Sequence, residues 1–184
     1  MKYRPKRSIV FCSWGSEEHG LIGSEEFVEE FYSVIQERAV AYINADVSFQ
    51  ANVYFKALAT PVLQELVYDV TQMIPDHADN SKTAYDVYLE YAPNSDSSRP
   101  EIGLGGVGSD YAPFQHTLGV PIIDVGFLQK NRTIPIYSTY HTAYDNFEYA
   151  SKWIDPGFKA AGTVSSIVGG FLIKLGESGG SLQT

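Results

Sequence analysis

Residues 8–35 read SIVFCSWGSEEHGLIGSEEFVEEFYSVI and combine three kinds of sequence pattern in a short stretch. The apolar run 8–14 predicts a buried strand that encloses the single cysteine, Cys12. Residues 15–23 mix glycine with carboxylates and predict a loop. After Ser24 the apolar side chains recur at the spacing of an amphipathic helix. A strand, a loop and a helix in this order indicate an α/β fold.

The rest of the chain repeats the alternation of strands and helices. Strands are predicted at 40–46 and 120–125, and helices at two Pro-initiated segments that begin with Thr60-Pro61 and Asp155-Pro156. Such alternation predicts a largely parallel sheet flanked by helices, with ligands at the carboxyl ends of the strands.

Two segments between these elements are less regular. Residues 76–101 carry many Asp, Asn, Ser and Pro residues, which predicts a long connection with one turn of structure near 85–91. Asp110, which follows a glycine-rich stretch, is expected to cap a short helix that ends at Leu118.

Size and charge exclude several classes of protein. The 184 residues suit one domain, and a net charge of −9 disfavours nucleic acid or an anionic membrane as partner, because both attract basic surfaces. No apolar run reaches the roughly 18 residues that span a bilayer, and no leader peptide is recognisable. The glycosylation sequon Asn131-Arg132-Thr133 fits an extracellular site.

Catalytic candidates should lie just past strand ends, where three polar groups follow apolar sequence: Glu17-Glu18, Asp46 and Tyr140-His141. Adjacent carboxylates can divide the roles of metal ligand and proton acceptor. A buried Asp46 would need a cation, and a neutral imidazole suits zinc. Taken singly, they could equally be an acidic loop, a turn aspartate and a packing histidine.

Four segments together carry a resemblance to a family. They are RSIVFCSWGSEEHGLIGSEEF (7–27), ERAVAYINAD (37–46), GVGSDYAPF (106–114) and IYSTYHTAYDNFEYASKWIDPGF (136–158). The sequence resembles the M28-type zinc exopeptidases of the glutamate carboxypeptidase II and transferrin receptor group, in particular the N-acetylated-alpha-linked acidic dipeptidase-like peptidases. The resemblance implies that residues 1–184 form part of a peptidase catalytic domain. Its core is expected at about 7–175, in a three-layer zinc-exopeptidase (phosphorylase/hydrolase-like) fold truncated at its N-terminal side.

The resemblance also implies roles for individual residues. Glu17 matches the general base and Tyr140 the residue that stabilises the oxyanion, while Glu18 and His141 match the ligands of one zinc and Asp46 a ligand of the second. Softer matches are Glu26 and Glu29, which suit calcium ligands or a solvated acidic face, and Ser109 and Asp110, which lie near the substrate in the family.

The sequence also departs from the family. Another histidine and a bridging aspartate are expected upstream of residue 8, so we expect weak or no stable dizinc binding and weak or no hydrolysis by this chain alone. In DVGFLQKN (124–131), Val125 and Phe127 stand where the acidic-dipeptidase branch has arginines, which predicts a preference for neutral or apolar substrate residues.

Two alternatives remain open: a non-catalytic binding module or relic like the transferrin receptor, and a single-zinc acyl transferase such as a glutaminyl cyclase. For the full-length protein, the resemblance implies a homodimer at an extracellular or cell-surface location. Any membrane attachment would come through a segment absent from this chain.

Overall fold

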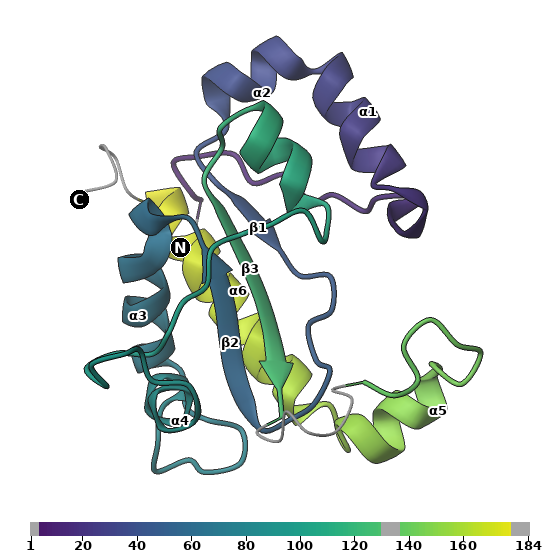
Figure 1. Cartoon of the computed structure of the whole chain (residues 1–184). Coiled ribbons are helices and arrows are strands. Elements are labelled where there is room, and N and C mark those ends of the chain that lie inside the picture. Colours follow the sequence, from purple (N-terminus) through teal and green to yellow (C-terminus); the bar gives the residue numbers. More distant parts are fainter. Residues whose placement is uncertain (1–3, 130–136, 178–184) are drawn as a thin grey trace.

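A small mixed sheet organises the chain (Figure 1). The computed structural model describes residues 4–129 and 137–177. Its strands are β1 (Tyr42–Asn44), β2 (Tyr54–Ala59) and β3 (Ile122–Leu128), in the spatial order β1-β3-β2. β1 runs parallel to β3 and β2 antiparallel to it.

The expected largely parallel sheet is therefore not found in the described part of the chain. The cause is the connection 45–53, which contains no helix. A parallel return requires a crossover of a dozen or more residues, whereas a shorter link reverses the chain. β2 was not predicted from the sequence, and it supplies the antiparallel edge.

One face of the sheet forms the main core. Alternate residues of β2 and β3 are buried there, among them Phe55, Ile123 and Phe127, each at most 1% exposed. The helices α3 (Gln64–Met73) and α6 (Lys159–Glu177) pack against this cluster, and Figure 1 shows α6 crossing behind the sheet. Gly170 of α6 lies where a Cβ would come 2.6 Å from the Val70 side chain, which allows the two helices to approach closely.

The predicted helices are largely confirmed, with shifted boundaries. The first is divided into α1 (Ile22–Glu30) and α2 (Tyr32–Arg38). The second begins with the turn η2 (Pro61–Leu63). The expected single turn near 85–91 is the helix α4 (Ala84–Tyr91), whose N-terminus is stabilised by a capping box of Thr83 and Asp86.

The last helix begins later than predicted. The elements α5 (Phe147–Tyr149) and η4 (Ala150–Ile154) come before α6. Asp155 still marks the start of α6, since its carboxylate accepts hydrogen bonds from the amides of Ala160 and Ala161. Its negative charge and two acceptors satisfy free N–H groups at that helix end.

The buried strand expected at 8–14 is wrong. These residues form no strand, Val10 and Phe11 are 75% and 85% exposed, and Cys12 is exposed. A strand is defined by a hydrogen-bonded neighbour, and within residues 4–129 and 137–177 none pairs with this segment. Trp14 is anchored through a 3.0 Å hydrogen bond from its indole N–H to the Tyr42 hydroxyl.

Asp110 does not cap the helical turn η3 (Pro113–Thr117) that follows it, because its carboxylate instead accepts a 2.6 Å hydrogen bond from Ser24.

No single helix in the described segments is long and apolar enough to cross a bilayer. A pair, Phe147–Ile154 with Lys159–Glu177, meets that test by length and composition but is bent by 96°. The sequon at Asn131 lies outside the described residues.

Candidate active site

A closed loop presents the two adjacent glutamates. Glu17 and Glu18 belong to the turn η1 (Glu17–His19), and Ser16 just before it has a left-handed backbone with φ 59°. The loop closes where the Gly23 amide donates to the Gly15 carbonyl oxygen at 3.1 Å. A Cβ on Gly23 would lie 2.5 Å from that oxygen, so only glycine permits this contact.

Asp46 lies just beyond β1 and is held by a chain of hydrogen bonds. The Ser109 hydroxyl donates to Asp46 Oδ2 at 2.8 Å, and Asn44 Nδ2 lies 2.9 Å from both Ser109 Oγ and Asp124 Oδ1. Asp46 itself is exposed, which corrects the argument that its burial demands a cation. Its position is fixed by Ser109 and Asn44, which are 4% exposed.

His141 and Tyr140 approach the glutamates from a distant part of the sequence. His141 Nε2 lies 2.6 Å from Glu18 Oε2, and the rings of Tyr140 and His141 stack with centroids 3.8 Å apart. His141 has φ 57°, a conformation that costs a non-glycine residue on the order of 1 kcal/mol and that often occurs at functional sites. The two residues that the family resemblance assigns to one zinc ion therefore lie in direct contact, and their role as metal ligands stays a prediction.

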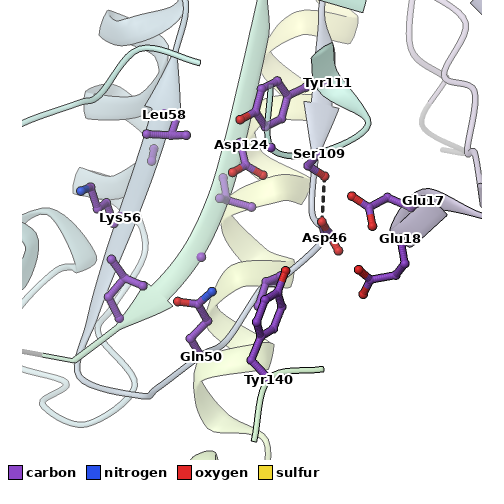
Figure 2. Close-up of a pocket in the computed structure, with 16 residues that line it drawn as sticks. Glu17, Glu18, Asp46, Gln50, Lys56, Leu58, Ser109, Tyr111, Asp124 and Tyr140 are labelled. Carbon is purple, nitrogen blue, oxygen red and sulfur yellow. Dashed lines mark hydrogen bonds between the residues drawn. The ribbon is translucent and has the colours of Figure 1, made fainter. Parts of the chain in front are cut away.

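The glutamates, Asp46 and Tyr140 line one cleft with a cavity volume of about 330 Å³. Figure 2 shows Glu17 and Glu18 on one side, Asp46 with its bond to Ser109 beside them, and Tyr140 below. The opposite wall is the open face of the sheet, with Lys56, Leu58 and Asp124.

The carboxylates influence one another's proton affinity. Partial loss of solvation raises the pKa of Glu17, and the negative charges of Asp46, Glu18 and Asp110 raise it further, while His141 opposes the shift. Loss of solvation, with the nearby carboxylates, also raises the pKa of Tyr140. Glu17 is therefore a better proton acceptor than an isolated glutamate, and Tyr140 keeps its proton for donation.

The remaining predicted residues differ in how they relate to the cleft. Asp110 is buried, 6% exposed, and bonded to Ser24. Ser109 lines the cleft but is 4% exposed and bonded to Asp46, so it supports a candidate ligand. Glu26 and Glu29 are exposed on α1, and their calcium role stays a prediction.

The specificity argument rests on Val125, which borders the cleft, and on Phe127, which does not line it, so the preference for neutral or apolar residues stays a prediction. Their side chains belong to the main core and are 2% and 0% exposed. Because strand side chains alternate, the cleft face of β3 carries Asp124, Gly126 and Leu128 instead. Asp124 was not predicted as a site residue, because a single acid within an apolar run is a weak signal. The alternation of side chains along the strand could have revealed it.

The metal ligands implied by the family are only partly assembled. Glu18 and His141 supply an oxygen and a nitrogen, the donor types that zinc binds, and they lie in direct contact. Across residues 4–129 and 137–177, no group of three or more His, Cys, Asp or Glu side chains is placed to hold a metal ion. Two of the implied ligands, Glu18 and His141, are thus brought together, and Asp46 lies on the same cleft.

Comparison with known proteins defines the class. Residues 1–156 match the model of peptidase family M28, and the chain belongs to that family. The mixed α/β arrangement is compatible with the M28 fold.

Individual relatives carry two kinds of name. The chain is 41% identical over 181 residues to aminopeptidase NAALADL1 of Mus musculus, covering 96% of this chain and 24% of that protein. It is 37% identical to the probable glutamate carboxypeptidase LAMP1 of Arabidopsis thaliana, covering 95% and 24%. A glutamate carboxypeptidase 2 homolog of Caenorhabditis elegans is 41% identical over 149 residues, covering 78% and 19%. The chain thus spans about a quarter of the length of these relatives or less.

Proposed function

We propose that this chain contributes the general base and part of the metal shell of a zinc-dependent exopeptidase, which hydrolyses peptide bonds near a terminus. The observation that carries the proposal is the contact between Glu18 and His141, at 2.6 Å, beside Glu17, Asp46 and Tyr140 on one cleft. Membership of a peptidase family and relatives named aminopeptidase and glutamate carboxypeptidase support it.

Glu18 and His141 would hold one zinc ion, and Asp46 would contribute to a second. Bound zinc polarises a peptide carbonyl and lowers the pKa of water to about 7. Ser109 donates a hydrogen bond to Asp46 and is itself held by Asn44, so that this carboxylate would need little reorganisation to bind a cation.

Glu17 accepts the proton of the attacking water and passes it to the leaving amine. Its raised pKa, caused by lost solvation and neighbouring carboxylates, brings its proton affinity closer to that transfer. Tyr140 lies on the same cleft and would donate its hydroxyl proton to the oxyanion of the tetrahedral intermediate.

The test measures zinc affinity and hydrolysis separately on the 184-residue chain. His141→Ala and Glu18→Ala should each lower zinc affinity at least about tenfold, because the loss of a residue that merely hydrogen-bonds to a metal ligand already costs about 10- to 100-fold. With zinc supplied, Glu17→Gln should retain zinc but lose about 100-fold or more of the release of terminal residues. Glu30→Gln, an exposed glutamate of α1, is the matched control. Hydrolysis that survives Glu17→Gln would overturn the assignment of the base.

Weak retention of metal is part of the same proposal. Because the described residues bring two rather than three or four ligands together, we expect this chain to hold less than two zinc ions after exhaustive dialysis. Close to two zinc ions per chain would contradict it.

A non-catalytic binding module, like the transferrin receptor, is the second candidate. The observation in its favour is that no group of three potential metal ligands is assembled in the described part of the chain. Zinc binding with no hydrolysis above that of Glu17→Gln would favour this candidate over the peptidase.

A further inference from the structure

Asp124 is an ionisable group in the cleft with no role in the chemistry described so far. It lies on β3, directly opposite Asn44 of β1 and Leu58 of β2. Its side chain shares the cleft face with Leu128, and Figure 2 shows it between the catalytic carboxylates and the Lys56–Leu58 wall.

The carboxylate of Asp124 has no cationic partner among the described residues. Asn44 donates one hydrogen bond to Oδ1 at 2.9 Å, and no ion pair of Asp124 occurs within the described residues. Burial raises its pKa to about 6, so it is mostly ionised at neutral pH despite reduced solvation. A cation that enters the cleft would gain from this charge more than from a fully solvated carboxylate.

A metal ion is a poor candidate for this position. The neighbours of Asp124 on the same face are Leu58, Gly126 and the amide of Asn44, which has already directed its donor group at the carboxylate. A metal needs several oxygen, nitrogen or sulfur ligands, whereas an ammonium group can be held by one carboxylate through charge-assisted hydrogen bonds.

The hydrogen-bonded connection to Asp46 suits an ammonium group at the amino terminus of a peptide. Three consecutive hydrogen bonds of 2.8 to 2.9 Å connect Asp46 Oδ2 through Ser109 and Asn44 to Asp124 Oδ1. Within one residue, about 2.5 Å separates the amino nitrogen from the carbonyl carbon, and each further residue adds about 3.5 Å. The connected hydrogen bonds keep Asp124 near Asp46, so an ammonium group at Asp124 and a scissile carbonyl beside Asp46 can belong to the same peptide terminus.

We infer that Asp124 binds the α-ammonium group of the first substrate residue and so directs the cleft to the amino terminus of peptides. The inference rests on the proposed exopeptidase function and narrows it to cleavage near a free amino terminus. Leu58 and Leu128 provide an apolar wall for the first side chain, and Lys56 disfavours a basic one.

The test compares two probes that differ only at the amine. Leucinamide carries a free ammonium group, and N-acetylleucinamide does not. Both are titrated into the isotope-labelled, metal-free 184-residue chain and followed by NMR, so that neither is hydrolysed. Leucinamide should bind at least tenfold more tightly, and Asp124→Asn should reduce this ratio to below about twofold.

Asp69→Asn removes an exposed carboxylate on α3 and is the matched control, since it should leave the ratio at its original value. Lys56→Met should increase the ratio, because it removes the cation that competes for the cleft. Equal binding of the two probes, no binding of either, or an unchanged ratio in Asp124→Asn would each overturn the inference.

The outcome is separable from that of the proposed function. If the chain hydrolyses peptides with Glu17 dependence but does not distinguish the probes, the exopeptidase proposal stands and the role of Asp124 fails. If Asp124 selects leucinamide but no hydrolysis occurs with zinc, the ammonium site stands and the peptidase proposal fails.

Discussion

Replacing Asp124 by asparagine should stabilise the protein at neutral pH. The pKa of Asp124 is raised from 3.8 to about 6 by burial, so folding favours its protonated form. A difference of about two pKa units corresponds to about 3 kcal/mol, since each unit is 1.36 kcal/mol. Asparagine keeps the shape and an oxygen acceptor for Asn44, and it carries no charge to be desolvated.

The sign of the pH dependence follows from the direction of the shift. A group whose folded pKa is raised contributes stability below its unfolded pKa and loses it as the pH rises through the folded value. The advantage of Asp124→Asn should therefore be about 3 kcal/mol at pH 7.5 and shrink to about 1 kcal/mol at pH 4.5.

Urea unfolding of both proteins at several pH values measures this difference directly. Asp69→Asn, which removes an exposed carboxylate, should show no comparable pH-dependent gain. If Asp124→Asn is less stable than the original chain at pH 7.5, or if the difference does not narrow as the pH falls, burial of an uncompensated charge is the wrong description of this site.

Three further substitutions test the supports of the site and the fold. Ser109→Ala removes the 2.8 Å hydrogen bond to Asp46, and it should cost about 1–3 kcal/mol in urea unfolding and weaken zinc binding in a metal competition assay. Gly23→Ala places a Cβ 2.5 Å from the Gly15 carbonyl oxygen, and it should lower stability by more than 1 kcal/mol and reduce hydrolysis. Thr83→Ala removes the capping box of α4, which should cost about 1 kcal/mol by thermal unfolding without changing zinc affinity.

The helices were predicted well because the signals that start and sustain a helix come from residues close together in the sequence. Pro61 at the start of the second helix and the apolar stripe after Ser24 act within a few residues. The pairing of strands depends instead on distant segments. The apolar run 8–14 has the composition of a strand, yet only a neighbouring strand could make it one, and β2 was overlooked because its partner β3 lies far along the sequence.

For a related reason, some residues of the candidate site were predicted from the sequence and others were not. The contact of Glu18 with His141 links residues that no sequence period relates, and only the combined family segments indicated it. The supports of Asp46 were missed, since Asn44 and Asp124 meet through the parallel pairing of β1 and β3. The exposure of Asp46 also shows that a polar residue after an apolar run need not be buried with it.

The cleft is formed by turns with strained backbones on one side and by residues of the sheet on the other. Glu17 and Glu18 lie between Ser16 and Leu21, which both have positive φ, and His141 has the same conformation. Each costs on the order of 1 kcal/mol for a non-glycine residue, a cost that surrounding structure must offset. Asp46 and Asp124 instead follow or belong to strands whose buried partners fix them. The proposed zinc site would therefore depend on strained turns for the placement of Glu18 and His141, and on hydrogen bonds from Ser109 and Asn44 for the placement of Asp46.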